Sequence, residues 1–315
     1  MERSDADMTL SLRVPGKAFL FGEYGALQGG AALLYSGPPY FHFQFSSSSR
    51  DLCLHQDSPA FRWLKMKSLS QPVGAEIYYP SYIESPFPQG GWGQSSAEFV
   101  AVLKKNASHQ FSAELIRANP QLLLNEYHRS FLIGNGNSAG VSVNLPSGYD
   151  VLAQFFEGYV LISQGVTQVK IFKEWPFPDL VTYLIPTGIK VKTHEYLDRE
   201  KVIVPSSLTE LCSKLSSAFE QRDSLLFLEL LKAFRLSLQS LGWEELHTIQ
   251  MIEDLESGPG FTLAKGCGAM GADFLYVLVK RHFLAEWEKY LNDFLSVWNI
   301  DPNKIVRLPS KLIEQ

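Results

Sequence analysis

A glycine-rich segment between a predicted strand and a predicted helix constrains the fold of this chain more than any other feature. Residues 88–97 have the sequence PQGGWGQSSA, after a β-rich run at 75–79 and before a stretch of helical composition at 95–105. Glycines let the backbone approach a ligand closely, and the first turn of a helix offers unpaired N–H groups to an anion. The segment predicts a phosphate-binding turn made of Gly90, Gly91, Gly93, Gln94, Ser95, Ser96 and Ala97. An ordinary glycine-rich loop with a capping serine is the alternative.

The composition predicts a globular protein without an extended nucleic-acid surface. The 315 residues are 45% hydrophobic, which is enough for one large core or two of ordinary size. The net charge is −5 and the 28 lysines and arginines are scattered, so a basic stripe is absent from the sequence. We therefore expect no nucleic-acid partner.

The cysteines and the N-terminus predict a cytoplasmic location. Cys53, Cys212 and Cys267 are an odd number and show neither a Cys-x-x-Cys pair nor histidines at metal-ligand spacing. The first residues are polar and acidic, unlike a signal peptide, and no apolar run approaches membrane-spanning length. We expect a reducing compartment and no membrane partner.

The order of predicted elements indicates two sheets with helices. Strands are predicted at 10–14, 18–21, 40–45, 75–79, 159–162, 169–172, 182–185, 274–279 and 305–308. Helices are predicted at 95–105, at 113–133, in two stretches within 206–241, and at 283–298. In the C-terminal half this order favours a sheet with helices packed on one face, and the best boundary lies within 180–205.

Three further segments carry residues suited to phosphate chemistry. Lys17 follows Val14-Pro15-Gly16 at the start of a strand, where its ammonium can contact a phosphate, although most lysines are solvated surface groups. Asp150 follows Pro146-Ser147-Gly148-Tyr149 beyond a flexible loop and is a candidate general base, or simply a turn residue. Residues 265–273 form another glycine-rich turn, for which tight steric packing is the alternative.

Taken together, these segments resemble the GHMP kinase family, in particular its mevalonate kinase and phosphomevalonate kinase branch. Residues 14–27 resemble the opening Pro-Gly-Lys to Gly-Glu-Tyr motif, and 88–97 resemble the Gly-Leu-Gly-Ser-Ser-Ala-Ala motif, with Trp92 in place of leucine. Residues 146–151 are similar to the Ser-Gly-x-Asp segment, 187–193 to Thr-Gly-x-x-x-x-Thr, and 265–273 to the closing glycine turn. All of these occur in family order.

The resemblance implies an α+β fold of two domains. Residues 1–185 would form a ribosomal S5 domain 2-like N-terminal domain, and 186–315 a ferredoxin-like C-terminal domain, with ATP and Mg²⁺ bound between them. It implies that Lys17 and Asp150 are catalytic and that Ser95 binds the metal, with Ser96 as the fallback. The substrate and closing-turn residues would be Ser147, Gly148, Lys192, Gly268 and Ala269. The implied partners are ATP and a small-molecule acceptor, and a homodimer stays open.

The departures from the family pattern concern the metal and the closing turn. Mevalonate kinases have a magnesium-binding glutamate eleven residues before the catalytic aspartate, where this chain has Ala139. Met270 and Ala272 stand where glycines are usual, so we expect a stiffer turn or a different substrate.

The acceptor is the remaining question. Val151 after Asp150, and Asp273 after the closing turn, favour phosphomevalonate kinase, with mevalonate kinase as the alternative. Arg129, Lys190, Lys192 and His194 are candidates for a phosphorylated acceptor, and each is equally well explained as a surface residue. A diphosphomevalonate decarboxylase-like lyase fits less well, because its Lys-Tyr-Trp-Gly-Lys motif differs from residues 19–23. A non-catalytic relative would lose Lys17, Ser95 or Asp150, all of which are present.

Overall fold

The computed structural model describes residues 10–48, 52–70, 76–88, 90–132, 145–163, 165–189 and 203–312. Its first sheet is antiparallel and has the order β1-β2-β4-β5, with β3 on the other part of β2. The strands are β1 (Leu10–Phe21), β2 (Ala32–Ser46), β3 (Tyr79–Glu84), β4 (Gly158–Ser163) and β5 (Gln168–Phe172). The strands predicted at 10–14 and 18–21 are therefore one continuous strand.

The strand predicted at 75–79 is wrong in position, because β3 begins at Tyr79. The backbone of Tyr78 is bound to a helix side chain instead of a strand. Its N–H donates to Asn106 Oδ1 at 2.8 Å, and its carbonyl accepts from Asn106 Nδ2 at 3.0 Å. These two bonds hold the approach to β3 against the helix that follows the glycine-rich segment.

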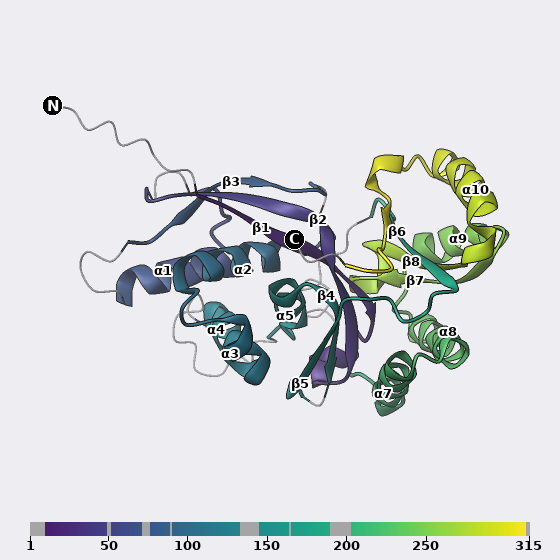
Figure 1. The fold of residues 1–315 in the computed structure, drawn as a ribbon, viewed down its shortest axis with the longest axis horizontal. Coiled ribbons are helices and arrows are strands. Elements are labelled where there is room, and N and C mark those ends of the chain that lie inside the picture. The colour runs from purple at the N-terminus through teal and green to yellow at the C-terminus, as the bar shows by residue number, and fades with distance from the viewer. Residues whose placement is uncertain are drawn as a thin grey trace.

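Helices lie along one side of this first sheet (Figure 1). They are α1 (Pro59–Ser70), α2 (Gln94–Ala107), α3 (Ala113–Ala118), α4 (Gln121–Leu132) and α5 (Tyr149–Phe156), and a short 3-10 turn, η1, spans Gly25–Gln28. Helices α2 and α5 pack directly against β1, and α1 and α4 pack against α2 and α5. Helix α5, which the sequence did not predict, begins directly after Gly148, so Asp150 stands in the first turn of a helix.

The second sheet is antiparallel with the order β7-β8-β6-β9. Its strands are β6 (Leu180–Pro186), β7 (Phe261–Cys267), β8 (Phe274–Lys280) and β9 (Val306–Arg307). Helices α9 (Leu246–Leu255) and α10 (Leu284–Val297) cover one face, where they pack against Leu275, Val277 and Val279. The alternate residues Tyr276 and Leu278 join the core of the first sheet. This is the arrangement that the sequence predicted for the C-terminal half.

Two more helices join the first core from the C-terminal half. Helices α7 (Ser206–Gln221) and α8 (Ser224–Ser240) are separated at Arg222, whose φ is 58°, and Asp223 caps α8 by accepting from Leu226 N at 3.0 Å. Their buried Phe219 and Phe227 pack against Trp175. The short 3-10 turns η3 (Ala269–Gly271), η4 (Arg281–Phe283) and η5 (Pro302–Lys304) complete the described elements.

The change from one sheet to the other falls between β5 and β6. The division expected at 185/186 falls within β6, which pairs with β8 and β9 along its length. The C-terminal residues return across this change of sheet, since Trp175 N donates to Ser310 O at 2.9 Å and Leu312 N donates to Lys173 O at 2.7 Å. Among the described residues, no helix has the length and apolar character needed to cross a membrane.

Candidate active site

The glycine-rich turn before α2 has the backbone that its sequence predicted. Gly90, Gly91 and Gly93 have φ angles of 93°, 92° and 84°, and Gly93 is the N-cap of α2. A Cβ on Gly93 would lie 2.8 Å from Lys17 Cγ and Cε, so the lysine side chain rests directly on this glycine. The first turn of α2 presents its unpaired N–H groups and the positive end of its dipole at the same place.

Trp92 anchors the turn. Its side chain is fully buried and its indole N–H donates to Pro39 O at 2.8 Å. It packs against Phe87 and Phe274 and fills the space above Gly16, where a Cβ would overlap the indole ring. The tryptophan that departs from the family pattern therefore joins the turn to β1 and to the second sheet.

Lys17 comes to the turn from β1. Its backbone N–H donates to Trp92 O at 3.0 Å, which fixes the strand against the turn. The side chain is half-buried, and Nζ lies 5.1 Å from the centroid of the Phe19 ring. Residues two apart on a strand share a face, so Phe19 supports the lysine as it passes over Gly93.

Helix α5 brings Asp150 to the same region. Gln154 is fully buried, and its Nε2 donates to Pro15 O at 2.7 Å and to Gly93 O at 3.2 Å. Asp150 stands four residues earlier on the same helix face, and its Oδ1 accepts from Val151 N at 2.9 Å. Gln154 therefore turns the Asp150 face of α5 towards the glycine turn, although no ion pair joins Asp150 and Lys17 in the described part of the chain.

The two serines at the start of α2 have different environments. The hydroxyl of Ser96 is buried and donates to Gly93 O at 3.0 Å, so it stabilises the turn. Ser95 is exposed, and its hydroxyl makes no hydrogen bond to another described residue. Gln94 is held along the helix by a 3.0 Å bond from its Nε2 to Glu98 Oε1. Ser95 is thus the serine that faces away from the protein.

The closing turn leads from β7 into β8 with a strained backbone. Gly268 and Gly271 have φ angles of 85° and 64°, and Met270 has a φ of 54°, in the left-handed region that costs an ordinary residue about 1–2 kcal/mol. Two hydrogen bonds hold the Met270 backbone in this conformation. Met270 N donates to the Tyr24 hydroxyl at 3.1 Å, and Glu245 N donates to Met270 O at 2.9 Å. Methionine thus occupies a glycine-type conformation because the first sheet's Tyr24 and the residue before α9 hold it there.

Asp273 stands between the two glycine turns. A Cβ on Gly91 would lie 3.2 Å from Asp273 Cβ, and one on Gly268 would lie 2.2 Å from Asp273 Oδ2. Its own backbone N–H donates to Cys267 O at 2.9 Å. A carboxylate therefore lies beside the predicted phosphate position. The sequence analysis considered Asp273 only as a feature that distinguishes members of the family, and did not predict this position.

Beneath the closing turn lies a buried ion pair between the two sheets. Lys265 Nζ is 2.8 Å from Glu23 Oε1, and the two side chains are 0% and 7% exposed. Burial lowers the pKa of Lys265, but Cys267 and the Glu23 carboxylate outweigh it, so its pKa lies above the ordinary value. A second buried pair, Arg235 with Glu244, lies 3.4 Å apart nearby.

The other predicted site residues divide into three groups. The hydroxyl oxygen of Ser147 accepts from Tyr149 N at 3.4 Å, and Gly148 is the N-cap of α5, so both belong to the start of this helix. Arg129 is exposed on α4 and pairs with Glu126 at 3.4 Å, which is the environment of a surface residue. Lys190, Lys192, His194 and Ala139 lie outside the described residues.

Sequence reasoning missed the residues that join the motifs. Gln154 had a usable signal, since it is the one uncharged polar side chain in the apolar helix α5, four residues after Asp150. The pairing of Glu23 with Lys265 had none, because the two residues are far apart in the sequence and each is ordinary in its own segment.

Neither a protein-family model nor a curated protein sequence matches this chain. Solved structures do match, and they define the class: the chain has the fold of the GHMP kinases. It is similar to Streptococcus pneumoniae phosphomevalonate kinase, with 18% identity and a TM-score of 0.69 over 96% of this chain and 100% of that one.

Two other matches extend over as much of the chain. The same Streptococcus pneumoniae enzyme in complex with phosphomevalonate and AMPPNP matches with 17% identity and a TM-score of 0.70, over 95% of this chain and 100% of that one. Methanococcus jannaschii mevalonate kinase matches with 15% identity and a TM-score of 0.65, over 99% and 100%. At this identity the likeness concerns the fold.

Proposed function

We propose that this chain is an ATP-dependent kinase of a small-molecule acceptor, with phosphomevalonate as the acceptor and mevalonate as the alternative. One observation carries the proposal: the Lys17 side chain lies on Gly93 at the start of α2, and Gln154 ties the Asp150 helix to the same glycine. A glycine-rich turn, the Lys17 side chain and the helix that carries Asp150 therefore lie together. That is the set of groups that phosphoryl transfer requires.

The glycine turn fits a nucleotide phosphate. A side chain on Gly91 would press against Asp273 and Phe274, and one on Gly93 would displace Lys17. The N–H groups at the start of α2 and the Lys17 ammonium provide positive charge for the phosphate. ATP would supply the phosphoryl group. Lys17 would then stabilise the charge that develops on the phosphoryl oxygens, and Asp150 would orient the acceptor and take its proton where it has one.

The oxygen donors beside the turn fit a magnesium ion. Ser95 has an exposed hydroxyl at the start of α2, and the Asp273 carboxylate lies against both Gly91 and Gly268. Mg²⁺ prefers such oxygen ligands together with substrate phosphates. Ser95 and Asp273 would hold the ion. The glutamate of mevalonate kinases is replaced by alanine at position 139 of this chain.

A panel of acceptors tests the proposal. The purified protein is incubated with Mg-ATP and, separately, mevalonate, phosphomevalonate, diphosphomevalonate, galactose or homoserine, and products are measured by mass. We expect ADP formation with phosphomevalonate, and its diphosphate product. Turnover with mevalonate alone would support the alternative, and carbon dioxide release from diphosphomevalonate would indicate a lyase. No turnover with any acceptor would contradict a kinase function.

A further inference from the structure

A cavity lies at the change from one sheet to the other, away from the glycine turns. Its volume is about 410 Å³, and it is lined by Trp175, Leu180, Val181, Thr182, Arg281, Arg307, Leu308, Pro309, Ser310 and Lys311. None of these residues belongs to the candidate active site. The cavity lies at the Leu180 end of β6, whereas Asp273 and Phe274 lie at the Pro186 end. The four residue steps from Thr182 to Pro186 span about 13 Å.

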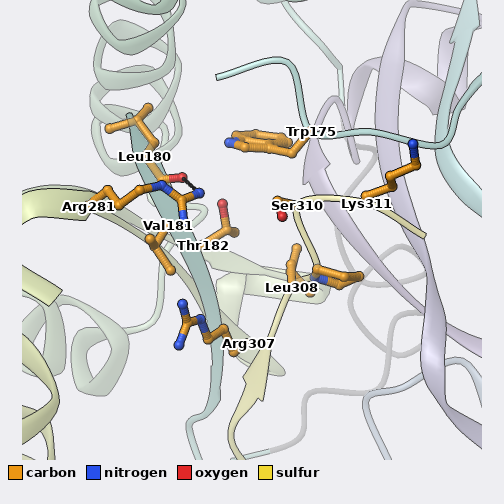
Figure 2. A pocket seen from close by; sticks show the side chains of 10 residues that line it. Trp175, Leu180, Val181, Thr182, Arg281, Arg307, Leu308, Ser310 and Lys311 are labelled. Atoms are coloured by element: carbon orange, nitrogen blue, oxygen red, sulfur yellow. Dashed lines mark hydrogen bonds between the residues drawn. The ribbon is translucent and has the colours of Figure 1, made fainter. Parts of the chain in front are cut away.

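Two buried polar groups in this cavity lack a hydrogen-bond partner. Trp175 is 7% exposed and Thr182 is 2% exposed, and neither Trp175 Nε1 nor Thr182 Oγ1 has a partner in the described part of the chain. Figure 2 shows the Trp175 ring on one side of the cavity and the Thr182 side chain directed into the space beside it. An unpaired buried donor costs about 1–3 kcal/mol.

The position of Thr182 makes this polar group conspicuous. Its strand neighbours on the same face, Leu180 and Leu184, both belong to the apolar core. The residue pairs with Leu278 on β8, and its carbonyl accepts from Leu308 N at 2.9 Å. Core packing alone would be satisfied by valine at this position, which has the same shape without a hydroxyl.

The rim of the cavity is cationic. Arg281, Arg307 and Lys311 line it, and no lining residue is acidic. Arg281 donates to the Pro178 and Leu180 carbonyls, so its charge is not neutralised by a carboxylate in this contact. Arg307 pairs with Glu288 at 3.1 Å, and Lys311 with Glu174 at 2.9 Å. Both pairs are exposed, and such pairs are weak enough to exchange for another anion.

We propose that this cavity binds a small organic oxyanion, a phosphate or carboxylate group on a short apolar body. The indole N–H is a donor only and the threonine hydroxyl can also donate, so both would bond the oxyanion or an oxygen next to it. The arginines provide the charge. Leu180, Val181 and Leu308 provide apolar walls for the body of the ligand. The volume lies at the small end of the range for ligand pockets.

A ligand here contacts both halves of the molecule. Thr182 and Arg307 stand on strands of the second sheet, whereas Trp175 and Ser310 are joined by a backbone bond at the edge of the first. Pro309 also accepts from the Tyr159 hydroxyl at 2.7 Å, which ties the C-terminal residues to β4. Binding therefore stabilises the contact between the sheets, and we expect the ligand to raise the melting temperature of the protein.

The indole N–H signals of the tryptophans test the proposal. The probes are butyl phosphate, inorganic phosphate and 1-butanol, titrated into ¹⁵N-labelled full-length protein, with Trp175 assigned from Trp175→Phe. We expect butyl phosphate to shift the Trp175 signal saturably. Trp287 is the matched control, since its Nε1 is also buried and unpartnered but lies outside this cavity. An unshifted Trp175 signal with both phosphates, or an equal shift with 1-butanol, overturns the proposal.

Two variants locate the bound group and one controls for charge. Thr182→Val should weaken butyl phosphate binding roughly 2- to 10-fold, and Arg307→Gln roughly 10-fold or more. Lys289→Gln removes one exposed charge on α10 that does not line the cavity and should leave binding unchanged. Wild-type affinity in both Thr182→Val and Arg307→Gln contradicts the site. Tighter binding of butyl phosphate than of inorganic phosphate supports an organic ligand, and equal binding supports free phosphate as the occupant.

Discussion

Lys265 and Glu23 form a buried ion pair across the two sheets, with Nζ and Oε1 2.8 Å apart. Lys265 stands on β7 just before the closing turn, and Glu23 follows β1. Lys265 Nζ also donates to Gly266 O at 2.6 Å. The pair therefore ties the closing turn to the opening motif, and the relative position of the two glycine turns depends on it.

We expect Lys265→Met to destabilise the protein by about 3–5 kcal/mol, because it leaves the Glu23 carboxylate buried without a partner. Glu23→Leu combined with Lys265→Met should recover much of this loss, since neither charge then remains. Urea unfolding of wild type and the two variants measures the effect. A double variant no more stable than Lys265→Met would show that the carboxylate is not the cause.

Gly93→Ala should abolish ATP binding while the protein stays folded. The added Cβ would lie 2.8 Å from the Lys17 side chain and would displace it from the turn. Gly242→Ala is the matched control, because Gly242 has a φ of 71° and open space around its Cα, so it carries similar backbone strain away from the site. Isothermal calorimetry with Mg-ATP compares the two. Equal ATP affinity in Gly93→Ala and Gly242→Ala would contradict the phosphate-binding turn.

The serines at positions 95 and 96 should respond in opposite ways. Ser96→Ala removes the bond to Gly93 O and should cost about 0.5–1.5 kcal/mol of stability, with the magnesium dependence unchanged. Ser95→Ala should leave stability unchanged, because its hydroxyl is exposed, and should raise the magnesium concentration that turnover requires. Thermal melts and magnesium titrations of the rate separate them. The metal role moves to Ser96 if only Ser96→Ala alters the magnesium titration.

Lys17→Met should reduce turnover by roughly 10²–10³-fold with any acceptor, because charge stabilisation in the transition state is lost. Asp150→Asn should depend on the acceptor. An alcohol must lose a proton, so we expect a loss of about 10²–10⁴-fold with mevalonate. A phosphate monoester has a second pKa near 6 and arrives mostly deprotonated, so the loss with phosphomevalonate should be mild. Steady-state kinetics measures each case, and near-normal turnover in Lys17→Met would remove this mechanism.

Lys104 should make stability rise with pH. Burial lowers its pKa from 10.5 to about 8, and its Nζ donates to Phe155 O at 3.0 Å. Between these pH values the unfolded chain still binds a proton that the folded protein has released, so the free energy of unfolding increases as pH rises through this window. We expect the free energy of unfolding of wild type, minus that of Lys104→Met, to rise by up to about 1.4 kcal/mol per pH unit in this window. Urea unfolding at pH 7.5 and 9.5 checks it, and a difference that does not change with pH contradicts a lowered pKa.

The sequence by itself determined the local elements of the site. Positive φ at Gly90, Gly91 and Gly93 follows from residue type. The sequence also placed the start of α2 to within one residue, although its N-cap is Gly93 and no serine side chain caps it. The glycine before Lys17 and the β-rich run after it placed this lysine at a strand, and the continuous apolar run at 274–279 predicted β8. These properties depend on interactions within a few residues, which is why they were predictable. The short helix α5 was not predicted, because it has only eight residues and directly follows Gly148.

Only the tertiary structure decided how these elements meet. Gln154 bonds β1 and the glycine turn together, Asp273 comes to lie beside Gly91, and Glu23 pairs with Lys265. The cavity beside Trp175 also exists only because the C-terminal residues return across both sheets. Each of these contacts joins residues distant in the sequence, and their partners are selected by packing and by the cost of burying a charge or a polar group. Composition and local pattern carry no information on that selection.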